Sequence, residues 1–401
     1  MNGRKIHSAL SASLIVLAGS ISASAQAVSP LCSPKVTANV VVASPNQRYA
    51  AGQKAQPPID DPVSGFAWPD TPLGIIKTTT GYEFFGSDGG AHYRQMWDGH
   101  WVGNNKSGSF VTTVGTLDNP LGSGDPQDVS VSPNPEAAMN PNYPSYGYMG
   151  GGPVFQVPAG MPGAGSLLAT YHAELPNDAL YAALGLVTST DNGLHWTDLG
   201  EIIRLNQSYA PGLDGFEIGD GPLALSPDGK YFYLYFPDWI ANGTLHIGSS
   251  TINVAVARAP VAAVLQAAFA SSPARTVTFE KFYSGSWDLQ PAVGGASTDL
   301  IPQAPFAGYL DIHYNSALQR YVLFISDDTD FAYAESVDAL HWTVPADIGT
   351  FGPIAAYPTA VGLGNDPHIL GSNYYVYFTH LPTDGSGWKN GELRRLSVTC
   401  Q

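Results

Sequence analysis

A short unit recurs five times along this chain, and it constrains the fold more than any other feature of the sequence. Each copy has a short apolar stretch, a turn and an aromatic-rich strand, and four copies open with an aspartate at the same place. Short antiparallel strands repeated in this way are typical of a β-propeller, whose innermost strands surround a central funnel. We therefore predict an all-β, five-bladed propeller, closed near its termini, with the repeated aspartates converging on the centre. The copies begin at Asp70, Gly152, Asp220, Asp311 and Asp366.

The first residues have the features of a secretory signal. Arg4 and Lys5 precede an apolar run from Ala9 to Ile21, and small residues follow at two acceptable cleavage sites. No later stretch approaches the roughly 18 apolar residues of a transmembrane helix. We therefore expect a secreted or periplasmic protein. The predicted segments are a signal peptide at 1–27, a loosely wrapping N-terminal segment at 28–62 and a single propeller domain at 63–401.

The charge balance limits the partners. The chain has 33 acidic and 17 basic residues and a formal net charge of −16. Such an excess of negative charge disfavours nucleic acid, anionic membranes and polyanionic substrates. A neutral polysaccharide or oligosaccharide suits the composition better. The sequence leaves the oligomeric state open.

Two cysteines, Cys32 and Cys400, lie at opposite ends of the sequence. In an oxidising compartment a pair of cysteines is expected to form a disulfide. A closed propeller brings its termini together, so we predict a Cys32–Cys400 bond.

Several features belong to the periphery of the fold. The alanine-rich stretch from Pro260 to Phe269 predicts one short helix, outside the third blade. The segment from Ser189 to Trp196 resembles the Asp-box turn of sialidase-like propellers, and Ser336 to Trp342 is a degraded copy. We interpret the aspartates of these two segments as structural, each marking a turn between the third and fourth strands of a blade.

Paired carboxyl groups are the usual means of cleaving a glycosidic bond. The segment Pro69-Asp-Thr-Pro-Leu resembles the first inner strand of glycoside hydrolase family 43, and Glu217-Ile-Gly-Asp-Gly-Pro resembles its Glu-Gly-Pro strand. The resemblance implies that Asp70 is the base or nucleophile. It also implies that the general acid is Asp220 or Glu217. Glu174 is a further candidate, because it follows the second strand of the second copy.

The second copy departs from that family. It begins Gly150-Gly-Gly-Pro, so the aspartate that modulates the pKa of the acid in family 43 is absent at the matching place. We expect the small glycines to open the funnel for a substrate, and His172 or Glu174 to substitute for the missing acid.

Other polar and aromatic residues are expected near the funnel, where carboxylates and histidines can tune pKa values or bind hydroxyl groups and tryptophans can stack on sugar rings. The histidine spacing shows no transition-metal motif, and no cofactor is required. Plentiful oxygen ligands allow a structural calcium ion in the pore. The predicted substrate-binding residues are Asp311, Asp366, His92, His172, His313, His368, Trp68, Trp97 and Trp101.

Together these features predict a secreted glycoside hydrolase that cleaves a neutral, furanose-containing glycan similar to arabinan. Two alternatives stay open. A non-catalytic glycan-binding propeller is favoured by the glycines of the second copy. A polysaccharide lyase with a His/Tyr pair is disfavoured by the negative charge, because lyase substrates are uronates.

Overall fold

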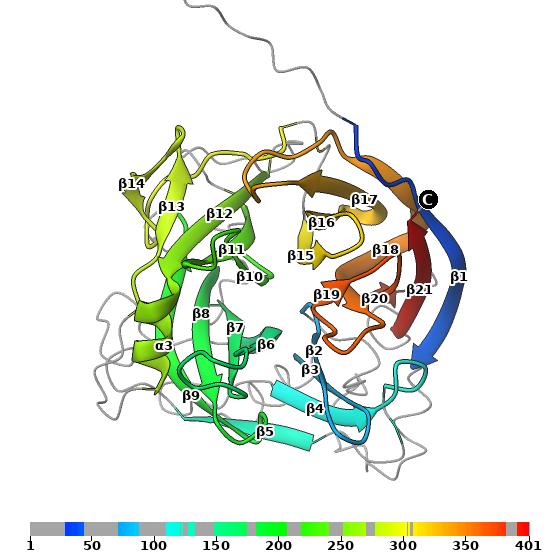
Figure 1. Ribbon diagram of the computed structural model, residues 1–401, viewed down its shortest axis with the longest axis horizontal. Coiled ribbons are helices and arrows are strands. Elements are labelled where there is room, and N and C mark those ends of the chain that lie inside the picture. The colour runs from blue at the N-terminus through cyan, green and yellow to red at the C-terminus, as the bar shows by residue number, and fades with distance from the viewer. Residues whose placement is uncertain are drawn as a thin grey trace, which may run out of the picture.

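The computed structural model shows a nearly all-β chain, in which consecutive groups of strands follow one another around a common centre (Figure 1). Within the described residues there is one helix. The structure describes residues 29–43, 71–87, 110–120, 122, 127–132, 148–174, 182–206, 218–239, 252–269, 277–302, 304, 308–381 and 391–400.

The first two strand groups lie in one eight-stranded sheet. Neighbouring strands within each group are antiparallel, and a parallel pairing between β5 and β9 joins the two groups. The first group is β2 (Gly74–Lys77), β3 (Tyr82–Ser87), β4 (Phe110–Gly115) and β5 (Gln127–Ser132). The second group is β6 (Tyr148–Gln156), β7 (Leu167–Glu174), β8 (Ala182–Ser189) and β9 (His195–Arg204).

The third group is a separate five-stranded sheet, and it carries the helix. The helix α3 (Val261–Phe269) begins directly after β12 and buries Val264 and Leu265, which confirms the predicted helix on the outside of this group. The strands are β10 (Leu223–Leu225), β11 (Tyr231–Asp238), β12 (Asn253–Pro260), β13 (Glu280–Tyr283) and β14 (Ser286–Pro291).

The last two groups share an eight-stranded sheet because one long strand belongs to both. The first part of β18 pairs with β17, and its second part, from Ile354 to Gly362, pairs with β20. The strands are β15 (Tyr309–Asn315), β16 (Arg320–Ser326), β17 (Asp328–Ser336), β18 (Ala346–Gly362), β19 (Ile369–Leu370), β20 (Asn373–Leu381), β21 (Glu392–Cys400) and β1 (Pro34–Ala43).

The N-terminal segment differs from its expected loose path. Pro34–Ala43 forms β1, which pairs antiparallel with β21 and so adds an N-terminal strand to the last group. The predicted Cys32–Cys400 disulfide is present, with the two Cα atoms 5.3 Å apart. The buried Glu335 carboxylate accepts hydrogen bonds from the backbone N–H groups of Leu31 (2.9 Å) and Cys32 (2.8 Å). The segment is therefore held by a strand pairing, a covalent bond and a buried carboxylate.

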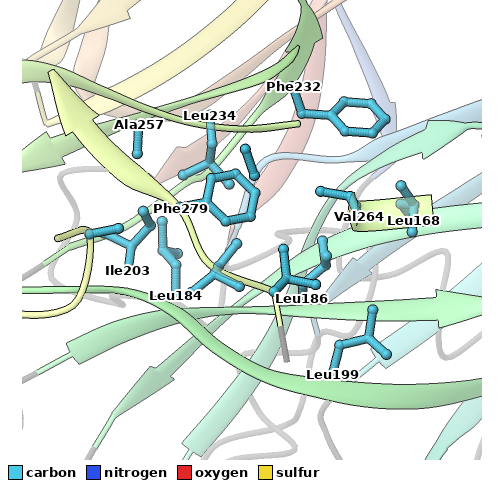
Figure 2. Packing of buried hydrophobic residues seen from close by; sticks show 14 of the residues in the cluster. Leu168, Leu184, Leu186, Leu199, Ile203, Phe232, Leu234, Ala257, Val264 and Phe279 are labelled. Carbon is cyan, nitrogen blue, oxygen red and sulfur yellow. The ribbon is translucent and has the colours of Figure 1, made fainter. Parts of the chain in front are cut away.

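Among the described residues, the core consists of five apolar clusters, each lying between two neighbouring groups, including one between the last group and the first. Figure 2 shows the cluster between the second and third groups, where Leu184 and Leu186 of β8 pack near Phe232 and Leu234 of β11. Apolar burial of this kind is the main force that holds strand groups together. The described helix, α3, is not long and apolar enough to cross a membrane.

The two Asp-box-like turns have the structural role that the sequence predicts. One joins β8 to β9, and the other joins β17 to β18, so each is a turn between the third and fourth strands of its group. In the first, Asp191 Oδ1 accepts a hydrogen bond of 3.0 Å from the His195 N–H group, and Trp196 packs edge-on against Phe85. In the second, Asp338 Oδ1 accepts one of 2.8 Å from the His341 N–H group.

Candidate active site at the centre of the strand groups

Asp220 lies just before β10, where the third group meets the fourth. Its side chain is buried, and Oδ2 accepts a hydrogen bond of 2.5 Å from the backbone N–H group of Leu310. The φ angle of Asp220 is 61°, in the left-handed region where a non-glycine residue is uncommon. Gly221 follows with a φ of 79°. Strained conformations of this kind cluster at functional sites, so this aspartate is a candidate for chemistry.

Asp311 occupies the corresponding place between the fourth and fifth groups. It lies on β15, is buried, and its Oδ2 accepts a hydrogen bond of 2.6 Å from the Ala360 N–H group on β18. The same oxygen lies 2.8 Å from Nε2 of His313. Asp220 and Asp311 therefore each hold two neighbouring groups together at the centre of the molecule.

Threonine side chains link the other pairs of neighbouring groups. Together with the two aspartates they connect every group to the next, and the fifth group to the first. The threonine contacts are Thr71 Oγ1 to the carbonyl of Gly151, Thr170 Oγ1 to the carbonyl of Gly221 at 2.8 Å, and Thr359 Oγ1 to the N–H group of Leu73 at 2.9 Å.

His313 and His368 form a stacked pair beside Asp311, with ring centroids 6.4 Å apart. His313 Nε2 faces Asp311, and Nδ1 lies 3.1 Å from the His368 carbonyl oxygen. Both partners are acceptors, so the charged form of the imidazole, in which both ring nitrogens donate, satisfies both contacts. Burial lowers the pKa of His313, but the Asp311 charge and the two hydrogen bonds outweigh this effect and hold the pKa above its usual value. Burial and the charge of His313 lower the pKa of His368 to about 4.

A small cavity of ≈ 20 Å³ lies among the inner strands, beside Asp311 and the two histidines. This is about the space that one water molecule needs. The lining comes from all five groups: Leu73, Ile75, Pro153, Val154, Pro222, Leu223, Asp311, Ile312, His313, Thr359, Ala360, Pro367 and His368.

The described residues do not gather three His, Cys, Asp or Glu side chains that could hold a metal ion. Calcium usually takes six to eight oxygen ligands. The calcium ion that the sequence allows in the pore stays a prediction.

The structure brings some of the predicted site residues together at the centre: Asp220, Asp311, His313 and His368. His172, on β7, is buried, and its Nδ1 donates a hydrogen bond of 3.0 Å to the carbonyl oxygen of Ile218, close to Asp220 in the chain. Glu174 ends β7, and its side chain lies outside the described part of the chain. The other predicted residues outside the described part are Asp70, Glu217, His92, Trp68, Trp97 and Trp101.

Asp366 does not open an inner strand, so the predicted start of the fifth copy was wrong. It is exposed and lies in the turn between β18 and β19, where Oδ1 accepts a hydrogen bond of 2.9 Å from the His368 N–H group. The strand that pairs with β20 is instead the second part of β18, which contains Tyr357-Pro358. Prolines also lie just before β2, within β6 and just before β10, and this is the sequence signal that could have given the correct start. Those prolines are Pro72, Pro153 and Pro222.

Gly152, in the second copy, also has a different role from the expected one. A Cβ atom on Gly152 would lie 3.2 Å from the carbonyl oxygens of Thr170 and Asp220. Such a distance is shorter than ordinary van der Waals contact, so the glycine permits close packing of the second and third groups. Gly152 therefore does not open space for a substrate.

Two tyrosines at this end of the inner strands were missed by sequence reasoning. Tyr309 is the first residue of β15, and Tyr357 lies in β18, with ring centroids 4.5 Å apart. Both side chains are partly exposed.

The sequence has little similarity to known proteins. No protein-family model matches the sequence, and no curated protein matches it significantly. Solved structures are similar in overall arrangement at low identity. The catalytic domain of a GH62 α-L-arabinofuranosidase from Coprinopsis cinerea has 13% identity and a TM-score of 0.46, over 86% of this chain and 95% of that one.

Two further structures are similar at the same level. A family 117 glycoside hydrolase from Zobellia galactanivorans has 11% identity and a TM-score of 0.45, over 83% of this chain and 84% of that one. An exo-β-1,3-galactanase from Phanerochaete chrysosporium has 14% identity and a TM-score of 0.44, over 84% of this chain and 63% of that one.

Proposed function

We propose that this chain is a secreted or periplasmic glycoside hydrolase with a closed five-bladed propeller, and that it cleaves a neutral glycan. Closure is supported by the cluster and the hydrogen bond between the last group and the first. The disulfide supports an oxidising compartment. Arabinan-like, furanose-containing polymers are the first substrates to test.

The observation that carries this proposal is the position of Asp220. It precedes the third inner strand, at the place where the sequence resemblance implies a general acid, and its backbone is held in the left-handed region. The buried Asp311 lies one group further round. In the proposed reaction Asp70 is the base or nucleophile, and Asp220, Glu217 or Glu174 protonates the leaving oxygen. Asp311 and His313 form a hydrogen-bonded pair on β15.

The experiment is product release by the protein from residue 28 onward on arabinan, arabinogalactan, xylan, fructan and β-glucan, followed by chromatography. We expect discrete products from one polymer, and loss of these products in Asp70→Asn and Asp220→Asn. Asp191→Asn is the matched control, because this aspartate lies in the outer turn between β8 and β9 and its side chain is 39% exposed. Full activity of both Asp70→Asn and Asp220→Asn would refute the assignment of these residues.

A second candidate function is a non-catalytic glycan-binding propeller. It is favoured by the use of Asp220 and Asp311 as acceptors for backbone N–H groups of the next group, a purely structural task. Retardation of the protein by one polymer in an affinity gel, without any product, would select this function.

A further inference from the structure

We propose that Tyr309 and Tyr357 together form an aromatic subsite that binds a sugar ring of the glycan. This inference rests on the proposed function and adds to it the residues that position the ligand. The two rings lie 4.5 Å apart between centroids with an interplanar angle of 63°. In such a pair the edge of one ring packs against the face of the other, so the two rings hold each other in place.

The position of the pair connects it to the central carboxylates. Tyr309 immediately precedes Leu310, whose N–H group is bound by Asp220, and lies two residues before Asp311. Tyr357 lies three residues before Ala360, whose N–H group is bound by Asp311. The same hydrogen bonds that hold the carboxylates therefore also fix the two strands that carry the tyrosines.

The backbone of Tyr357 is the second observation. Its φ angle is 59°, which is a marked outlier for a bulky residue. The register of β18 against β20 shifts between Ala356 and Thr359, so an extra residue bulges from the strand at Tyr357. Bulges redirect side chains, and strain of this kind persists where the surrounding structure enforces it, often at ligand sites.

The chemistry of the pair suits a neutral sugar. Each tyrosine combines an apolar ring with a hydroxyl group, and both side chains are partly exposed. A sugar ring likewise has apolar C–H faces and polar edges. The net charge of −16 disfavours an anionic ligand at this place.

Affinity gel electrophoresis tests the subsite, with arabinan, arabinogalactan, xylan, fructan and β-glucan as the probes. Tyr309→Ala and Tyr357→Ala are each expected to weaken retardation by the best polymer between about threefold and tenfold. Tyr314→Ala is the matched control. It removes a partly exposed tyrosine from the other end of β15, one that also pairs with a second tyrosine, Tyr321, at 5.4 Å.

Tyr357→Gly separates binding from a structural role. Glycine adopts a positive φ without strain, whereas alanine does not, so Tyr357→Gly should unfold at a higher temperature than Tyr357→Ala. Both variants should lose binding to the same extent. Tyr357→Phe should retain most of the binding, because the ring is still present.

The outcomes are distinguishable. Retardation of the wild type that Tyr309→Ala and Tyr357→Ala leave unchanged overturns the subsite alone. A wild type retarded by none of the five polymers overturns both the subsite and the proposed function. Retardation that these two variants weaken and Tyr314→Ala preserves supports the subsite.

Discussion

The aspartates at the centre and those of the outer turns bind backbone N–H groups in the same way, but over very different separations in the sequence. Asp191 and Asp338 bind N–H groups within four residues, and their side chains are 39% and 43% exposed. Asp220 and Asp311 bind N–H groups 90 and 49 residues away and are each 4% exposed. An outer aspartate shapes one turn, whereas a central aspartate determines how two strand groups fit together.

The largest effect is expected when a central aspartate is removed. Asp311→Ala leaves the buried His313 ring and the Ala360 N–H group without the carboxylate that both contact. Removing one partner of a buried ion pair typically costs about 3–5 kcal/mol of unfolding free energy. Urea unfolding at pH 7 measures this loss.

Asp311→Asn is the control for that variant. Its amide oxygen can still accept the Ala360 N–H group, so it should lose less stability than Asp311→Ala. A loss below about 1 kcal/mol for Asp311→Ala would mean that Asp311 contributes no more to stability than the exposed aspartates of the outer turns. That result would contradict the contrast between the two regions.

The histidines beside Asp311 predict that the unfolding free energy depends on pH, an effect that we do not expect from the outer turns. The pKa of His368 is about 4 in the folded chain and about 6.5 in the unfolded chain, so the unfolded chain binds more protons between these values. Stability should therefore fall as the pH drops from about 6.5 to about 4. His313 acts in the opposite sense. Its pKa is raised, so its contribution is complete below about pH 6.5 and is lost as the pH rises through the folded value.

Unfolding by urea from pH 4 to pH 8 measures this behaviour. His368→Gln should flatten the acid side of the profile, while His195→Gln, which changes an exposed histidine of an outer turn, should leave it unchanged. If the unfolding free energy of wild type and of His368→Gln fell equally steeply on the acid side of the profile, His368 would not be buried in its neutral form.

The smallest effects are expected in the outer turns. Asp191→Ala and Asp338→Ala each remove local hydrogen bonds to exposed N–H groups, and the loss should be about 1 kcal/mol, as for a helix cap. Product release should be unchanged, because Asp191 and Asp338 bind N–H groups within their own turns. A loss above about 3 kcal/mol in either variant would mean that these turns hold the strand groups together, as the central aspartates do.

The same contrast explains how much of the molecule can be predicted from sequence. The outer turns are set by residues close together in the chain, so Ser189 to Trp196 could be assigned to its turn correctly. The disulfide could be predicted because the chain offers one pair of cysteines, and the helix because its composition is locally distinct. The all-β class follows from the aromatic strands and their turns.

The register of the fifth group could not be predicted in this way. Asp366-Pro367 and Tyr357-Pro358 both precede a short apolar stretch and the strand that begins at Asn373. The choice between them depends on which segment pairs with β20, and that pairing is a contact between distant strands. With Asp366-Pro367 taken as the start, Tyr357 was not recognised as a site residue. Its contact with Tyr309 is made from the bulged part of β18.

The most direct test of the proposed active site is a paired measurement on Asp220→Asn. The amide oxygen can still accept the Leu310 N–H group, so the unfolding free energy should change by less than about 2 kcal/mol. Loss of a general acid should reduce the hydrolysis rate on the identified polymer by at least about 100-fold. A variant that keeps its rate, or one that loses rate only in proportion to the fraction unfolded, would contradict a catalytic role for Asp220 and leave it as a structural link between strand groups.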